Sequence, residues 1–157
     1  MVPRDVTIAV VENELPALNN FAQRRGWSVS WLAVQLAVIA DGKHHGDNTS
    51  VRVHADVTGY RVVPPAWRFV LPDSIEPKPH RFPRGGTVPG GVGSIFHGKG
   101  VICAPFNRLA YKEHDGMHGD WGGPENWLDV RGHVRATTLA EMLAQIVMHL
   151  RYSPGWN

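Results

Sequence analysis

The only cysteine of the chain, Cys103, is the residue best suited to covalent chemistry. A lone thiol forms no intramolecular disulfide, so this side chain serves either packing or reactivity. Its apolar neighbours Ile102 and Phe106 are typical of a buried cysteine. As a thiolate, the same side chain is a strong nucleophile. No basic residue adjoins it to lower its pKa, and His97 and Lys99 are the nearest candidates to assist it.

Polar side chains that could serve a nucleophile follow Cys103 in the chain. Asn107 is the nearest side-chain amide, and either it or the backbone amides of residues 103–106 could donate to the oxyanion of a tetrahedral intermediate. A local backbone hydrogen bond is the alternative for Asn107. Residues 111–126 are polar, and a proton acceptor or a solvated loop explains them equally well. The candidate acceptors in this stretch are His114, His118 and Asp120.

A metal site is a further alternative for the same stretch. The spacing His114-x-x-x-His118 is typical of zinc ligands, and Cys103 could be a third donor. However, Asp115 stands where the metalloprotease motif has glutamate, and two nearby glycines disfavour the helix that would align the rings. We therefore expect no metal and no other cofactor.

The length, net charge and apolar stretches of the chain indicate what kind of protein carries these residues. The chain has 157 residues and a formal net charge of +2, which predicts one globular domain over residues 1–157 and gives no reason to infer a nucleic-acid partner. Its start has no basic segment leading into a sustained apolar region, and Gln35 interrupts the longest apolar stretch. We therefore expect a cytoplasmic protein that does not enter a membrane.

The first half of the chain predicts one helix followed by strands. Apolar residues at helical spacing predict a helix over residues 14–25, which begins close to Pro16 because a first turn tolerates proline, and ends at Gly26. Residues 27–40 are apolar and uncharged, which predicts a strand covered on both faces. Residues 51–57 alternate between apolar and polar side chains, which is typical of a strand with one solvated face.

The second half of the chain adds one strand and one helix. A third strand is predicted at Trp67, Phe69 and Leu71, and the proline- and glycine-rich residues 72–100 then lead to the cysteine. Thr138 begins a capping box before a helix with a continuous apolar face. The predicted fold class is α+β: an antiparallel β-meander flanked by an N-terminal helix and a C-terminal helix.

Three motifs resemble the ubiquitin-conjugating enzymes over about residues 10–150. Residues 51–69 are similar to that family's strand, flap and following strand. Residues 94–103 resemble its Gly-x-Ile-Cys approach to the catalytic cysteine, and Trp127 with the final helix resembles the tryptophan and helix that come after it. The residues that match the flap are Tyr60, Pro64 and Pro65.

The chain also departs from that family. Arg61 stands where the flap usually begins its prolines, the crossing to Cys103 is longer than usual, and the family's His-Pro-Asn triplet is absent, with Gly98 following His97. The chain is therefore most similar to divergent bacterial members of the ubiquitin-conjugating (UBC-like) fold. These accompany a ubiquitin-like protein, an activating enzyme and a peptidase in prokaryotic conjugation systems, including those of antiphage defence.

The resemblance implies a function and partners. Cys103 would accept a ubiquitin-like protein as a thioester from an activating enzyme and transfer it to an amine or another nucleophile on a target protein. Residues 111–126 lie where the family places groups that deprotonate an incoming lysine. The activating enzyme could contact the first helix near Arg24 and Arg25, but the simpler interpretation of these arginines is that they complement the helix dipole.

Two other functions remain open. A cysteine hydrolase would use Cys103 with His114, His118 or His133 as its base. A noncatalytic domain that binds ubiquitin-like proteins would keep the flap and the helices without needing the thiol.

Overall fold

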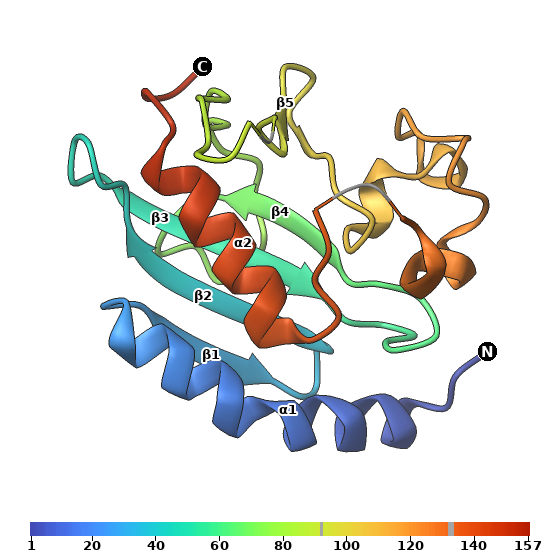
Figure 1. Cartoon of the computed structure of the whole chain (residues 1–157). Coiled ribbons are helices and arrows are strands. Elements are labelled where there is room, and N and C mark those ends of the chain that lie inside the picture. The colour runs from blue at the N-terminus through green and yellow to red at the C-terminus, as the bar shows by residue number, and fades with distance from the viewer. Residues whose placement is uncertain (92, 132–133) are drawn as a thin grey trace.

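A computed structural model, which describes residues 1–91, 93–131 and 134–157, combines two helices with a four-stranded antiparallel sheet of order β1-β2-β3-β4 (Figure 1). The predicted α+β arrangement with a helix at each end is confirmed, with four strands in the sheet where three were expected. The helices are α1 (Arg4–Arg24) and α2 (Leu139–Arg151), and the sheet strands are β1 (Ser28–Leu32), β2 (Ala37–Lys43), β3 (Ser50–Asp56) and β4 (Ala66–Val70). Within the described residues, no helix is long and apolar enough to span a membrane.

Helix α1 begins ten residues before the predicted start. Its buried residues recur at helical spacing from the first turn to the last, and they are Thr7, Val11, Leu18 and Ala22. Pro16 lies inside the helix rather than in its first turn. An interior proline removes one backbone hydrogen bond, and the buried side chains before and after Pro16 hold both halves of the helix against the core.

Residues 27–40, predicted as one strand, form most of a hairpin. Strands β1 and β2 pair antiparallel, with Leu32 opposite Ala37, and the intervening turn places Leu36 at φ +50°. This turn was not predicted, because residues 33–36 contain no glycine, proline, asparagine or aspartate. Residues 37–40 of β2 are buried on both faces, as expected for that part of the run.

Strands β3 and β4 confirm the clearest sequence pattern. Val53 pairs with Phe69 and Ala55 with Trp67, and all four side chains are buried. The polar residues between them on β3 are only partly exposed, because residues 71–79 cross this face and Arg52 donates a hydrogen bond to the Ser74 carbonyl (2.8 Å). Leu71, predicted as part of the third strand, lies beyond the end of β4 and is exposed.

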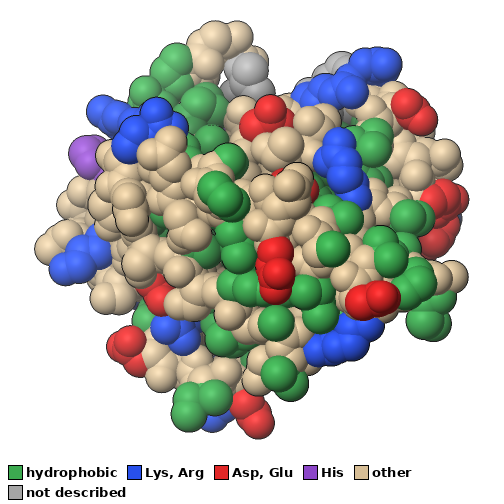
Figure 2. Space-filling model, turned by 90° about the horizontal axis from the view of Figure 1, so that it is seen from below, with side chains coloured by type: hydrophobic (Ala, Val, Ile, Leu, Met, Phe, Trp, Pro, Cys, Tyr) green, Lys and Arg blue, Asp and Glu red, His purple; other side chains and the backbone are tan. Residues whose placement is uncertain are grey.

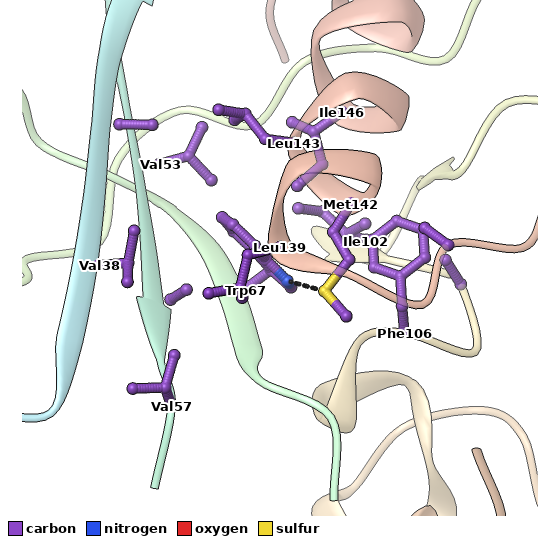
Figure 3. Packing of buried hydrophobic residues seen from close by; sticks show 14 of the residues in the cluster. Val38, Val53, Val57, Trp67, Ile102, Phe106, Leu139, Met142, Leu143 and Ile146 are labelled. Atoms are coloured by element: carbon purple, nitrogen blue, oxygen red, sulfur yellow. Dashed lines mark hydrogen bonds between the residues drawn. The ribbon is translucent and has the colours of Figure 1, made fainter. Parts of the chain in front are cut away.

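Helix α2 packs its apolar face across the sheet and closes the core. Its predicted cap is present, since the Thr138 hydroxyl accepts a hydrogen bond from the Glu141 amide (3.2 Å). The Trp67 indole N–H points to the sulfur of Met142 (3.4 Å), which joins β4 to α2 (Figure 3). Ile102 and Phe106, which flank the cysteine segment, lie in the same packed cluster. The core therefore supports the chain directly on both sides of Cys103.

Candidate active site

Cys103 follows a short hairpin that rests on the core. Strand β5 (Phe96–His97) pairs with β6 (Val101–Ile102), and the Cys103 amide donates to the Ile95 carbonyl at 2.6 Å. The Ile95 amide in turn donates to Nδ1 of the buried His149 on α2 (3.3 Å). The Cys103 side chain itself is partly buried. One backbone hydrogen bond and one bond to the His149 side chain thus connect the cysteine, through Ile95, to α2.

Residues 111–121 fold back on the segment after the cysteine. They follow the short 3-10 helix η1 (Arg108–Ala110) and contain another, η2 (Lys112–His114). The His118 amide donates to the Ala110 carbonyl (3.0 Å), and the Lys112 amide donates to the His118 carbonyl (3.0 Å). Gly116 is required for this closure, since a Cβ atom there would lie 2.2 Å from the Ala110 carbonyl carbon. Backbone hydrogen bonds therefore hold the loop, and they fix the position of the His118 backbone.

The loop brings His118 and Asp120 into line with the cysteine. Cys103 Sγ lies 2.9 Å from His118 Nε2, and His118 Nδ1 lies 3.0 Å from Asp120 Oδ1. We assign the neutral tautomer with the proton on Nδ1, because the carboxylate accepts it and leaves Nε2 to accept from the thiol. This arrangement of nucleophile, base and orienting carboxylate is the one used by enzymes that form covalent acyl intermediates.

Aromatic side chains fix the plane of the imidazole. The Trp121 ring stacks on His118 at 3.6 Å between centroids and an angle of 3°. Tyr111 contacts the same indole edge-on at 5.4 Å, and its hydroxyl donates to the Pro105 carbonyl (2.7 Å). Trp121 was not among the residues expected at the site from the sequence. Its position next to Asp120 was the one signal that it belongs to the site.

The electrostatics of the site keep the thiol protonated at rest. Burial raises the pKa of the Cys103 thiol, and the negative charge of Asp120 raises this pKa further. The nucleophile is therefore a neutral thiol hydrogen-bonded to His118 rather than a preformed thiolate. Attack requires the proton to move to Nε2 as the new bond forms.

Asn107 is part of the scaffold beneath the cysteine. It is fully buried, and its side-chain oxygen accepts from the Trp67 amide (2.9 Å) and the Leu109 amide (3.3 Å). Its amide group donates to the Ile102 carbonyl (2.8 Å), one residue before Cys103. These bonds are the local backbone role that the sequence left open, and they direct the side chain away from solvent. An incoming substrate therefore does not reach this amide.

The other predicted assistants lie apart from the thiol. His97 is exposed at the β5–β6 turn, where its Nδ1 accepts from the Lys99 amide (3.2 Å). His114 is exposed in η2. Within the described part of the chain, neither histidine makes a hydrogen bond to Cys103. His133, the third candidate base of a hydrolase, lies outside the described residues.

The residues matched to the flap pack beside the segment that follows the cysteine. Tyr60 is fully buried and its ring lies 6.3 Å from that of Trp127, whose indole donates to the Arg61 carbonyl (3.1 Å). Pro64 and Pro65 are buried, and the Pro65 carbonyl accepts from the Arg108 amide (2.9 Å). Tyr60 and Trp127, two of the residues that carried the resemblance, therefore lie side by side although far apart in sequence.

Of the three residues weighed as metal ligands, Cys103 and His118 lie together, but His114 does not join them. Among residues 1–91, 93–131 and 134–157, no three His, Cys, Asp or Glu side chains are grouped so as to hold a metal ion. His118 directs one ring nitrogen to sulfur and the other to a carboxylate, on opposite edges of the ring. This geometry suits proton transfer between Cys103, His118 and Asp120 rather than coordination of one metal ion by all three.

A hollow of about 360 Å³ adjoins the carboxylate side of the site. Asp120 and Trp121 form one wall, and Asp129 at the end of the 3-10 helix η3 (Pro124–Asp129) adds a second carboxylate. Arg131 is the single cation among the described residues that line it. The hollow therefore offers negative charge within reach of the triad.

The sequence matches no protein-family model, and neither a curated protein nor a solved structure matches the chain.

Proposed function

We propose that the protein carries an acyl group as a thioester on Cys103 and transfers it to an amine or another nucleophile, as a divergent member of the ubiquitin-conjugating fold. The acyl group is the C-terminus of a ubiquitin-like protein received from an activating enzyme. The observation that carries the proposal is the 2.9 Å contact between Cys103 Sγ and His118 Nε2, with Asp120 on the other ring nitrogen. The motifs that resemble this family, and the sheet with its two helices, agree with the proposal.

The first step is a balanced thioester exchange. Cys103 Sγ attacks the thioester carbon of the donor while its proton passes to His118 Nε2. The bond between that carbon and the donor sulfur then breaks, and the departing thiolate takes the proton from His118. One thioester is made and one is lost, so the protein supplies alignment and proton transfer rather than a driving force.

The second step uses the same groups. An acceptor amine attacks the acyl carbon on Cys103, His118 accepts an amine proton, and Cys103 departs and recovers a proton from the imidazolium. The carboxylates Asp120 and Asp129, which outnumber the single cation Arg131 among the described residues of the adjoining hollow, favour the approach of a cationic amine. This amine gives one proton to solvent before its nitrogen attacks. The hydrogen bonds of Asn107 direct its amide into the core, so the backbone N–H groups of Ala104 and Phe106 are left for the oxyanion, since Pro105 has none.

The raised pKa of Cys103 favours a carrier over a hydrolase. A thiol of higher pKa is a poorer leaving group, so its thioester reacts more slowly with water. A preformed thiolate and imidazolium pair, which many cysteine hydrolases use, is disfavoured by the same shift. The same effect slows attack by an amine, so the choice between water and an amine depends on which nucleophile reaches the acyl carbon.

The test uses a peptide α-thioester as donor, with intact mass measured without reductant. We expect one acyl group on the protein, removed by a reducing thiol and transferred when lysine is added. Cys103→Ser gives no thiol-labile adduct. With the physiological ubiquitin-like protein, activating enzyme and ATP, the same adduct appears on a nonreducing gel. If the folded chain is acylated no faster than the chain unfolded in urea, the proposal is refuted.

A cysteine hydrolase is the second candidate, because the same three residues also suit that reaction. The two functions differ in the fate of the acyl group. A carrier holds it in buffer and releases it to lysine, whereas a hydrolase releases it to water with or without lysine. Measuring the decay of acyl-Cys103 in both conditions separates them.

A further inference from the structure

A cavity of about 700 Å³ lies between the C-terminal ends of α1 and α2, away from Cys103. Figure 1 shows these helix ends on the opposite side of the molecule from the loop that carries His118. The turn after β2 and Pro89 of the long crossing complete its walls. The volume is within the range of about 300–1,000 Å³ that is typical of ligand sites. The cavity is separate from the site described above.

The floor of this cavity is apolar. Phe21 and Trp27 contribute from the end of α1 and the residues after it, and Val147, Met148 and Leu150 contribute from α2. Met148 is among the exposed large hydrophobic residues of the described chain. Methionine adapts to irregular apolar partners because its side chain is unbranched and flexible. The floor is thus suited to apolar side chains of a partner.

The rim of the cavity is basic. Its four cations come from α1, the residue after it, β2 and α2, and they are Arg24, Arg25, Lys43 and Arg151. Within the described residues, none of the four makes a salt bridge, and no carboxylate lines the cavity. Since the whole chain has a net charge of only +2, this rim is far more positive than the average surface. Figure 2 shows basic side chains and a histidine together at one edge of the face seen from below.

The helix dipoles account for only part of this charge. Arg24 and Arg151 lie in the last turns of their helices, where a cation complements the dipole. Lys43 comes from β2, where no dipole requires it. Cations from separate elements around one apolar floor indicate recognition of a ligand with several separated negative charges and apolar groups between them.

We propose that this cavity binds an acidic, partly apolar polypeptide segment of a partner protein. The carboxylates of the segment pair with the basic rim, while its apolar side chains cover Met148 and the floor. Several charges spread along one chain match cations on three elements better than the compact charge of a small anion does. The proposal does not depend on the chemistry of Cys103.

The test is fluorescence anisotropy with a labelled peptide in which glutamate alternates with leucine. We expect saturable binding that weakens with salt, and no binding of the peptide with lysine in place of glutamate. Charge reversal at the rim, Arg25→Glu with Arg151→Glu, should weaken binding by about tenfold or more. Met148→Ala should weaken it by about threefold to fivefold. Thermal unfolding of each variant shows that it is folded.

Matched controls separate this site from general attraction between charges. Lys78→Glu with Arg68→Glu changes the net charge by the same amount at exposed positions outside the cavity and should leave affinity unchanged. Equal losses in both double variants would overturn the proposal. Inorganic triphosphate that binds as tightly as the peptide, with no effect of Met148→Ala, would show a simple anion patch and also overturn it. Acylation of Cys103 by a peptide α-thioester, which needs no activating enzyme, should be the same in all these variants, so failure here is distinguishable from failure of the proposed function.

Discussion

Replacing His118 by glutamine tests the triad most directly. Glutamine keeps polarity and size but cannot accept the thiol proton, so the contribution of a general base is lost. Such a base is worth about 10²- to 10⁴-fold in rate, and we expect acylation of Cys103 by a peptide α-thioester to slow by that factor. The 2.9 Å contact to Nε2 and the raised pKa of the thiol are the reasons for expecting the full effect.

Replacing Asp120 by asparagine should have a much smaller effect. The Asp120 side chain is 69 % exposed, and exposed ion pairs contribute about 0.2–1 kcal/mol, which corresponds to about 1.4- to 5-fold in rate. The substitution also removes a charge that raises the pKa of Cys103. Alkylation of Cys103 by iodoacetamide at neutral pH, which depends on the thiolate, should therefore become faster while acyl transfer becomes slower.

The assay measures acylation and alkylation of each variant by intact mass, and the single cysteine makes each adduct unambiguous. His114→Gln is the matched control, because His114 is an exposed histidine of the same loop with no hydrogen bond to Cys103 among the described residues. It should react like the unchanged protein. Equal acylation rates for His118→Gln and His114→Gln, with both variants folded, would refute the role of His118.

Three further predictions concern stability and the loop. Asn107→Ala leaves buried backbone groups without partners and should lower the free energy of unfolding by about 2–4 kcal/mol in urea titrations, whereas the exposed Asn126→Ala should change it by less than about 0.5 kcal/mol. Gly116→Ala should greatly slow acylation because the loop cannot close. Gly119→Ala should be tolerated, because the nearest neighbour of the added Cβ is a flexible lysine carbon at 3.3 Å. Similar acylation rates for the two variants would contradict the role given to Gly116. Burial lowers the pKa of His149, so the unfolded chain binds a proton that the folded chain does not. The melting temperature should therefore fall as pH drops below about 6.5, and less steeply in His149→Gln; identical pH profiles would exclude this contribution.

Helices and strands were predictable where the pattern of apolar and polar residues shows which face is buried. The alternation over residues 51–57 placed β3, and the capping box with its apolar face placed α2, because each pattern records which side is buried. The hairpin of β1 and β2 was missed because residues 33–36 lack turn residues. The start of α1 was misplaced because Pro16 was expected to lie in the first turn of a helix. Buried side chains before and after Pro16 instead stabilise a helix that contains it.

The candidate site was also predictable only in part. The sequence by itself identified the single thiol and a short set of polar residues near it, since residue type alone limits which groups are nucleophiles or bases. It could not choose among His97, His114 and His118, because a histidine acts only where its ring nitrogen meets the sulfur. The folded loop decided this: Gly116 allows the closure, Trp121 fixes the ring, and Asp120 holds the tautomer.

The role of Asn107 also could not be decided from the sequence, since an amide four residues after the thiol could face either the substrate or the core. Packing in the folded chain directs it into the core. The basic cavity between α1 and α2 was likewise hidden, because its cations lie far apart in sequence and meet only when both helices end at the same side of the sheet. Residue type therefore determined what chemistry this chain can do. Tertiary structure decided which residues do it, because catalysis and recognition depend on distances that local sequence does not set.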